Sequence, residues 1–149
     1  MRGAFRAVLQ GGLLAGILDI VAAFIVYGFR GATPFRILQS IASGLLGAEA
    51  FELGLTTAAL GGLLHFFIAC GWALVYYGAS RQLSVLTKRP VLSGVAYGAA
   101  VYLLMNLVVV PLSAVPKRAF TFDAVILVVH MVCVGLPIAL SVSRSAPKA

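Results

Sequence analysis

Charged residues are scarce in this chain of 149 amino acids: they make up 10% of it, whereas 62% of the residues are hydrophobic. Soluble globular domains carry about 25% charged residues. The mean hydropathy of +1.07 also lies far outside the range of soluble domains. These values exclude a soluble protein and leave a membrane protein as the class that fits.

The chain also has only two cysteines, and motifs for catalysis are missing. The two cysteines, Cys70 and Cys133, fall inside apolar segments. The sequence therefore has no extracytoplasmic disulfide framework, and we interpret both residues as small apolar filler. A nucleophile elbow, a P-loop and an HExxH motif are all absent, and only His130 and Cys133 have the close spacing of metal ligands. We expect neither an enzyme nor a metal site.

Four apolar segments are long enough to cross the hydrocarbon layer of a bilayer, which takes about 20 helical residues. They cover residues 8–28, 57–78, 91–113 and 121–143. Residues 1–149 are thus predicted to form a single integral membrane domain, an all-α bundle of four transmembrane helices.

A short amphipathic helix is predicted between the first two spans, over residues 34–46. Pro34 is favourable at a first helical position, where its missing N–H is not needed. One face of this helix is apolar and carries Ile37, Leu38, Ile41 and Leu45. We expect it to lie in the outer membrane interface. A break is expected within residues 44–47, because a longer helix would place Glu49 and Glu52 on the apolar face.

Lysine and arginine outnumber acidic residues by eleven to four. They are spread over loops and termini rather than gathered on one face, which argues against nucleic acid as a partner. With four spans, the side that holds both termini carries seven of them: Arg2, Arg6, Arg81, Lys88, Arg89, Arg144 and Lys148. The opposite side carries four: Arg30, Arg36, Lys117 and Arg118. The positive-inside rule therefore predicts that both termini are cytoplasmic.

Polar residues inside the spans are the best guide to function. Asp19 lies in the middle of the first span, and His65 and His130 lie at matching depths in the second and fourth. A charged residue at the bilayer centre costs about 2.5–3.5 kcal/mol, so it usually faces protein or water and often has a function. In a four-helix bundle, we expect Asp19 to meet His65, His130 and, slightly toward the outer side, Asn106.

Small residues indicate where the spans pack closely. Those of the first span share one helical stripe with Asp19: Gly12, Gly16 and Ala23. In the third span, Gly94 and Gly98 repeat the pattern. Such stripes let two helices approach closely, so we expect Asp19 to face a helix rather than lipid.

Three roles fit the predicted cluster. As an interhelical hydrogen-bond network, it would serve a structural or accessory subunit of a membrane complex. As a chain of carboxylate and imidazole groups, it would serve proton-linked movement of a small solute. Finally, His65 and His130 could be the two axial ligands of haem b in an electron-transfer protein. Haem is the one cofactor considered, and only under this third role.

The size of the bundle bears on its partners. Four spans enclose a narrow interior, so a transport role would require a homo-oligomer or a partner membrane subunit. The lipid bilayer is the remaining expected partner.

The second half of the chain has a recognisable set of positions: Gly94, Gly98, Met105, Pro111, Leu112, Pro116, His130 and Gly135. Before them, a stretch runs from Gly61 through His65 to Trp72 and Tyr77. Together they resemble the uncharacterised YagU-like inner-membrane proteins of bacteria, although the long polar outer loop of that family is missing. The resemblance implies a helical bundle in the bacterial cytoplasmic membrane, and it carries no assigned reaction or ligand.

Overall fold

A computed structural model describes residues 2–117 and 119–145, with side chains from Phe5 onward. Within these residues the secondary structure is entirely helical. Four helical segments are long and apolar enough to span a membrane: Phe5–Phe29, Leu55–Ser80, Pro90–Leu112 and Ala124–Ser145. The prediction of an all-α bundle with four spans is confirmed, and the chain has the features of a multi-pass membrane protein.

The elements follow one another in chain order: α1 (Arg2–Phe29), α2 (Pro34–Leu46), η1 (Gly47–Phe51), α3 (Leu55–Ser80), α4 (Val85–Lys88), α5 (Pro90–Leu104), η2 (Met105–Val109), α6 (Val110–Leu112), α7 (Ala124–Val129), η3 (His130–Gly135) and α8 (Leu136–Ser145). The η1 segment is a 3-10 helix, whereas η2 and η3 are π-helical. The third span therefore consists of α5, η2 and α6, and the fourth of α7, η3 and α8.

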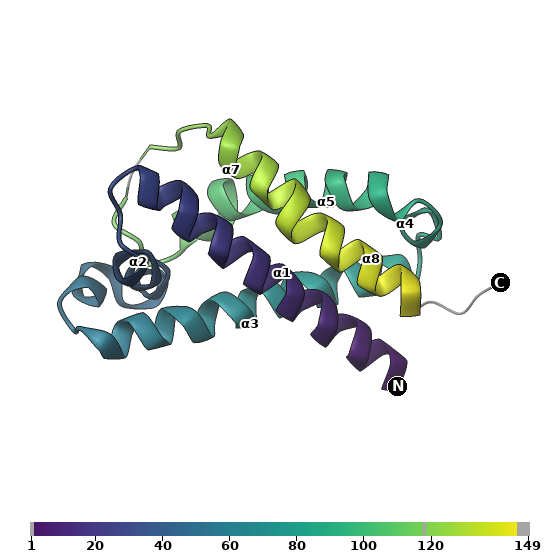
Figure 1. The fold of residues 1–149 in the computed structure, drawn as a ribbon, viewed down its shortest axis with the longest axis horizontal. Helices are drawn as coiled ribbons and strands as arrows, with labels where there is room; N and C mark the ends of the chain where they lie inside the picture. Colours follow the sequence, from purple (N-terminus) through teal and green to yellow (C-terminus); the bar gives the residue numbers. More distant parts are fainter. Residues whose placement is uncertain (1, 118, 146–149) are drawn as a thin grey trace.

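The first residues of α1 and the last residues of α8 lie at one end of the bundle, together with α4 (Figure 1). We call this the terminal end, and the opposite end, where α2 lies across the direction of the spans, the α2 end. The first span packs between α3 and α8, while α5 packs on η3 and α8. The fourth span is the most enclosed: 39% of an apolar 18-residue stretch of it is buried, against 17–22% in the corresponding stretches of the other three.

Glycines allow the third and fourth spans to pack backbone to backbone. A methyl group on Gly98 would overlap the carbonyl of His130, and one on Gly135 would overlap the carbonyl of Gly94. In the first span, Gly12 packs on the backbone of Cys70 in the same way. The close packing that was predicted from these stripes is confirmed.

The second helix begins and ends where the sequence predicts. The Thr33 side chain caps α2 by accepting a hydrogen bond from the Arg36 N–H. Gly47 ends it with a φ of 62°, a backbone conformation that favours glycine. Figure 1 shows α2 nearly end-on, at right angles to the spans, as expected for a helix in the membrane interface.

Only part of the predicted apolar face of α2 packs within the bundle, at Ile37. Leu45 is 62% exposed, whereas Gln39 is buried against α3. The cause is the way α2 crosses α3. The carbonyl of Leu38 packs directly on Gly61, and the Gln39 amide donates a hydrogen bond to the Thr57 hydroxyl. Because glycine admits the helix so closely, a polar side chain can reach a buried partner there.

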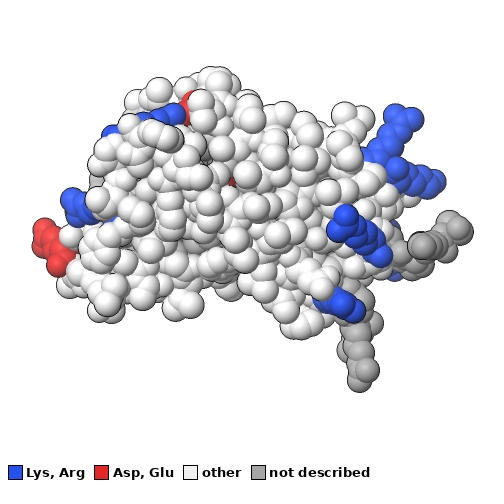
Figure 2. Space-filling model, in the orientation of Figure 1, with Lys and Arg blue, Asp and Glu red and all other residues white. Residues whose placement is uncertain are grey.

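The two ends of the bundle differ in charge. Figure 2 shows only basic side chains at the terminal end, but both acidic and basic ones at the α2 end. The acidic residues there include Glu49 and Glu52, which are exposed as expected. Arg118, Lys148 and the side chain of Arg2, all counted in the sequence prediction, lie outside the described residues.

Candidate functional site

A carboxylate and an imidazole, those of Asp19 and His130, lie next to each other between the first and fourth spans. The Asp19 carboxylate lies 4.0 Å from Nδ1 of His130. Both side chains are largely enclosed, with 18% and 17% of their surface exposed respectively. Two residues that were predicted to meet are therefore neighbours, and solvent or another chain can still reach them.

The hydrogen bond at Nδ1 sets the chemistry of His130. This nitrogen lies 2.9 Å from the carbonyl of Ile126, one turn earlier in the same span. Because a carbonyl can only accept, Nδ1 carries the hydrogen, and in the neutral ring Nε2 holds the lone pair. A proton taken up at Nε2 would create a cation beside Asp19. Cys133 lies near enough to Asp19 for the two groups to interact electrostatically.

His65 reaches the same stretch of α1 but bonds to its backbone. Nε2 of His65 lies 2.8 Å from the carbonyl of Gly16, one turn before Asp19. This nitrogen must be the donor, again because the carbonyl can only accept. The two histidine-bearing spans thus contact α1 within one turn of each other. Ligation of haem would require His65 to release this bond from Nε2, and that role stays a prediction.

Asn106 lies apart from the pair, toward the α2 end. Its amide donates a 2.9 Å hydrogen bond to the carbonyl of Tyr102 in its own span. The ring of Tyr102 in turn meets the ring of His130 edge to face, with 5.7 Å between centroids. Tyr102 therefore contacts both Asn106 and the His130 member of the Asp19–His130 pair.

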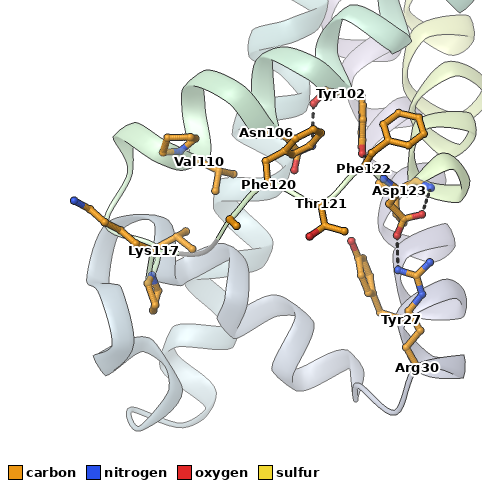
Figure 3. Close-up of a pocket in the computed structure, with 15 residues that line it drawn as sticks. Tyr27, Arg30, Tyr102, Asn106, Val110, Lys117, Phe120, Thr121, Phe122 and Asp123 are labelled. Atoms are coloured by element: carbon orange, nitrogen blue, oxygen red, sulfur yellow. Dashed lines mark hydrogen bonds and ion pairs between the residues drawn. The ribbon is translucent and has the colours of Figure 1, made fainter.

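A cavity of about 600 Å³ lies at the α2 end, next to these residues. We call it the Arg30 pocket, and its wall includes Tyr27, Arg30, Tyr102, Asn106, Phe120 and Asp123. Figure 3 shows that these side chains come from the end of the first span, from the third span and from the segment that leads into the fourth. Asn106 and Tyr102 belong to this wall. Because Tyr102 contacts His130, the pocket adjoins the Asp19–His130 pair.

An ion pair of Arg30 with Asp123 closes one side of the pocket. One guanidinium nitrogen of Arg30 donates to Asp123, whose other carboxylate oxygen accepts from the N–H groups of Val125 and Ile126 (Figure 3). Asp123 thus caps the N-terminal end of the fourth span. The hydrogen bond from Arg30 lowers the pKa of Asp123 and raises that of Arg30.

Sequence reasoning missed the pocket and the Arg30–Asp123 pair. Arg30 ends the first span and Asp123 precedes the fourth, so a four-span topology places both at the same end. Opposite charges at one end were a usable indication. The contact of Tyr102 with the backbone N–H of Asp123, at 2.9 Å, left no trace in the sequence.

The described residues contain no group of three or more His, Cys, Asp or Glu side chains that could hold a metal ion. No protein-family model, curated protein or solved structure matches this chain. The resemblance to YagU-like proteins therefore stays a prediction.

Proposed function

We propose that this chain is a bacterial inner-membrane protein, with both termini in the cytoplasm, that moves a small solute together with a proton. The observation that carries this proposal is the Asp19–His130 pair. A carboxylate and an imidazole from two different spans lie 4.0 Å apart and are only partly exposed. Chains of such groups are the usual material of proton relays in membrane proteins.

The chemistry of the pair suits reversible proton binding. Since Nδ1 of His130 donates to the Ile126 carbonyl, Nε2 holds the lone pair that can accept a proton. Asp19 offers the balancing charge, so a proton can enter without leaving an isolated cation in a low-dielectric region. Cys133 lies near Asp19, and the Tyr102 ring contacts the His130 ring.

The asymmetry of the bundle supports a transport role. Most of the buried core lies between the middle of the bundle and its terminal end: Ala7, Ala15, Ala73, Tyr76, Val101, Val134, Ile138, Ala139 and Val142. The Arg30 pocket lies on the other side of the Asp19–His130 pair, toward the α2 end. A solute path that is open at one end and packed at the other is what alternating access requires of one of its two states.

Two π-helical segments provide places where the spans can bend. Each ends two residues before a proline: Met105–Val109 precedes Pro111, and His130–Gly135 precedes Pro137. Proline lacks the N–H that would complete the helical ladder, and π-helical turns are frequent at functional sites. One segment begins at His130 and the other contains Asn106, so bending there would move the polar residues themselves.

The proposal can be tested in liposomes that contain the purified protein and a pH-sensitive dye. A dialysable extract of small cellular solutes is added while the lumenal pH is recorded. We expect a pH change with the wild type and at least about a tenfold slower one with Asp19→Asn or His130→Gln, equivalent to a barrier difference of about 1.4 kcal/mol. Gly71→Ala, which faces open space, is the matched control. Equal responses of the wild type and Asp19→Asn would overturn the proposal.

A second candidate function is an accessory subunit of a membrane complex. It is favoured by the partial exposure of Asp19 inside a membrane span, because a partner helix could cover that carboxylate. Copurification of a partner from native membranes, lost in Asp19→Leu and retained in Gly71→Ala, would support this role. Mass measurement in mild detergent would separate it from a homo-oligomeric transporter.

A further inference from the structure

We propose that the Arg30 pocket is a binding site for a small anion with an aromatic or apolar body. The inference deepens the proposed function, since this anion would be the solute that moves with the proton. It rests on the charge, the unused hydrogen-bond donors and the walls of the cavity.

The charges around the pocket favour an anion. Its lining contains two cations, Arg30 and Lys117, and one carboxylate, Asp123. Both oxygens of Asp123 already accept hydrogen bonds, one from Arg30 and two from backbone N–H groups. Among the described lining residues, positive charge therefore exceeds negative charge, and the one carboxylate is paired with Arg30.

Arg30 supplies the donors. A guanidinium has five N–H groups in a planar fork, and the pair with Asp123 uses only one side of it. The Arg30 side chain remains 45% exposed, so a carboxylate, sulfonate or phosphate oxygen can approach the other N–H groups. The Lys117 side chain points away from the cavity in Figure 3, and we assign direct recognition to Arg30 rather than to Lys117.

The walls fit the apolar part of such a ligand. The rings of Phe120 and Phe122 lie 6.5 and 6.2 Å from that of Tyr102, centroid to centroid, and Tyr27 closes the side next to Arg30. Aromatic walls with a few polar groups are typical of small-molecule sites, and the volume of about 600 Å³ lies within their usual range. An inorganic ion alone would leave most of this space empty.

The position of the pocket links the anion to the proton. Asn106 and Tyr102 line its inner wall, and Tyr102 contacts His130. An anion that enters brings negative charge toward His130, and a proton on that ring would balance it. Movement of one monoanion with one proton carries no net charge across the membrane.

Binding can be measured with the full chain in nanodiscs of zwitterionic lipid. The probe is 4-fluorobenzenesulfonate, and its uncharged isostere 4-fluorobenzenesulfonamide is the control ligand, both followed by fluorine NMR. We expect the sulfonate to bind at least about tenfold more tightly than the sulfonamide, a difference of about one decade in Kd. Equal affinity for the two compounds would overturn the proposal.

Two variants with opposite expected effects keep the test independent of folding. Arg30→Gln should weaken sulfonate binding, whereas Asp123→Asn should strengthen it, because it frees the guanidinium from its internal partner. Arg36→Gln is the matched control, since Arg36 lies at the same end but bonds to the Phe51 carbonyl outside the pocket. Weaker binding in both Arg30→Gln and Asp123→Asn, or equal losses in Arg30→Gln and Arg36→Gln, would contradict the assignment.

A repeat in nanodiscs with anionic phosphatidylglycerol separates a soluble anion from a lipid headgroup. The salt concentration is raised so that the surface potential is screened. Unchanged sulfonate binding assigns the site to a soluble anion, and competition by the lipid assigns it to a headgroup; both outcomes support recognition of an anion. No proton gradient is present, so a failure of binding is distinct from a failure of proton-linked movement.

Discussion

At the residue scale, the choice of partners decides what each polar group can do. The depths of Asp19, His65 and His130 were visible in the sequence, because ionisable residues stand out in apolar segments. The contact of Asp19 with His130 was predicted, but the hydrogen-bond partners of the two histidines were not visible. His65 donates a hydrogen bond to the backbone carbonyl of Gly16. Nδ1 of His130 donates to the carbonyl of Ile126 and also lies near the Asp19 carboxylate. Backbone carbonyls occur at every position, so a side-chain pattern cannot predict which of them a histidine will select.

The Arg30–Asp123 pair gives a prediction for stability in acid. The folded state lowers the pKa of Asp123 below its ordinary value of 3.8, chiefly through the hydrogen bond from Arg30. Folding therefore favours the charged carboxylate, and this contribution is fully present above that ordinary value. It is lost as the pH falls through the lower pKa of the folded state. Asp123→Asn should be less stable at neutral pH and should lose less stability on acidification.

Thermal unfolding in detergent, followed by circular dichroism from neutral pH to below pH 4, would measure this difference. The control is Glu49→Gln, which changes an exposed carboxylate at the same end. Parallel profiles for the wild type and Asp123→Asn would show that the pair contributes nothing to folding.

At the scale of the elements, length and apolarity were enough to predict the four spans, and Pro34 and Gly47 fix the ends of α2. The π-helical turns were beyond prediction. Pro111 and Pro137 indicate a local disturbance, but its form depends on how the third and fourth spans pack. The side of α2 that packs on α3 could not be predicted either, because the close approach at Gly61 is a property of two helices together.

The close contact of the third and fourth spans gives a prediction at this scale. Gly98→Ala should destabilise the bundle by about 1–3 kcal/mol, because its methyl group would overlap a backbone carbonyl that cannot move aside. Gly71→Ala has open space and should stabilise by about 0.5–1 kcal/mol, since alanine is the better helix residue. Denaturant unfolding in mixed micelles would compare them. Equal stability of the two variants would refute the packing argument.

At the scale of the whole molecule, charge sets the proposed orientation. The terminal end carries Arg6, Arg81, Lys88, Arg89 and Arg144, with no acidic residue beside them in Figure 2. The α2 end mixes both signs. A fluorescent protein that matures only in the cytoplasm should therefore fluoresce when fused to either terminus. Replacement of Arg81, Lys88 and Arg89 by glutamine should reduce this preference for cytoplasmic termini. If both fusions to the wild type stay dark, the proposed orientation is wrong.

The Arg30 pocket lies toward the α2 end of the Asp19–His130 pair, and the largest cluster of buried apolar residues lies toward the terminal end. We propose that this arrangement lets an anion and a proton move together.

The most direct test is the uptake of 4-fluorobenzenesulfonate into liposomes that contain the protein, driven by a pH gradient that is acidic outside. This sulfonate stays charged throughout the pH range used, so it cannot cross the bilayer as a neutral acid. Wild-type protein should accumulate it only while the gradient lasts, and Asp19→Asn should bind it but fail to accumulate it. Accumulation by Asp19→Asn, or wild-type uptake that does not depend on the pH gradient, would contradict the coupled movement of anion and proton.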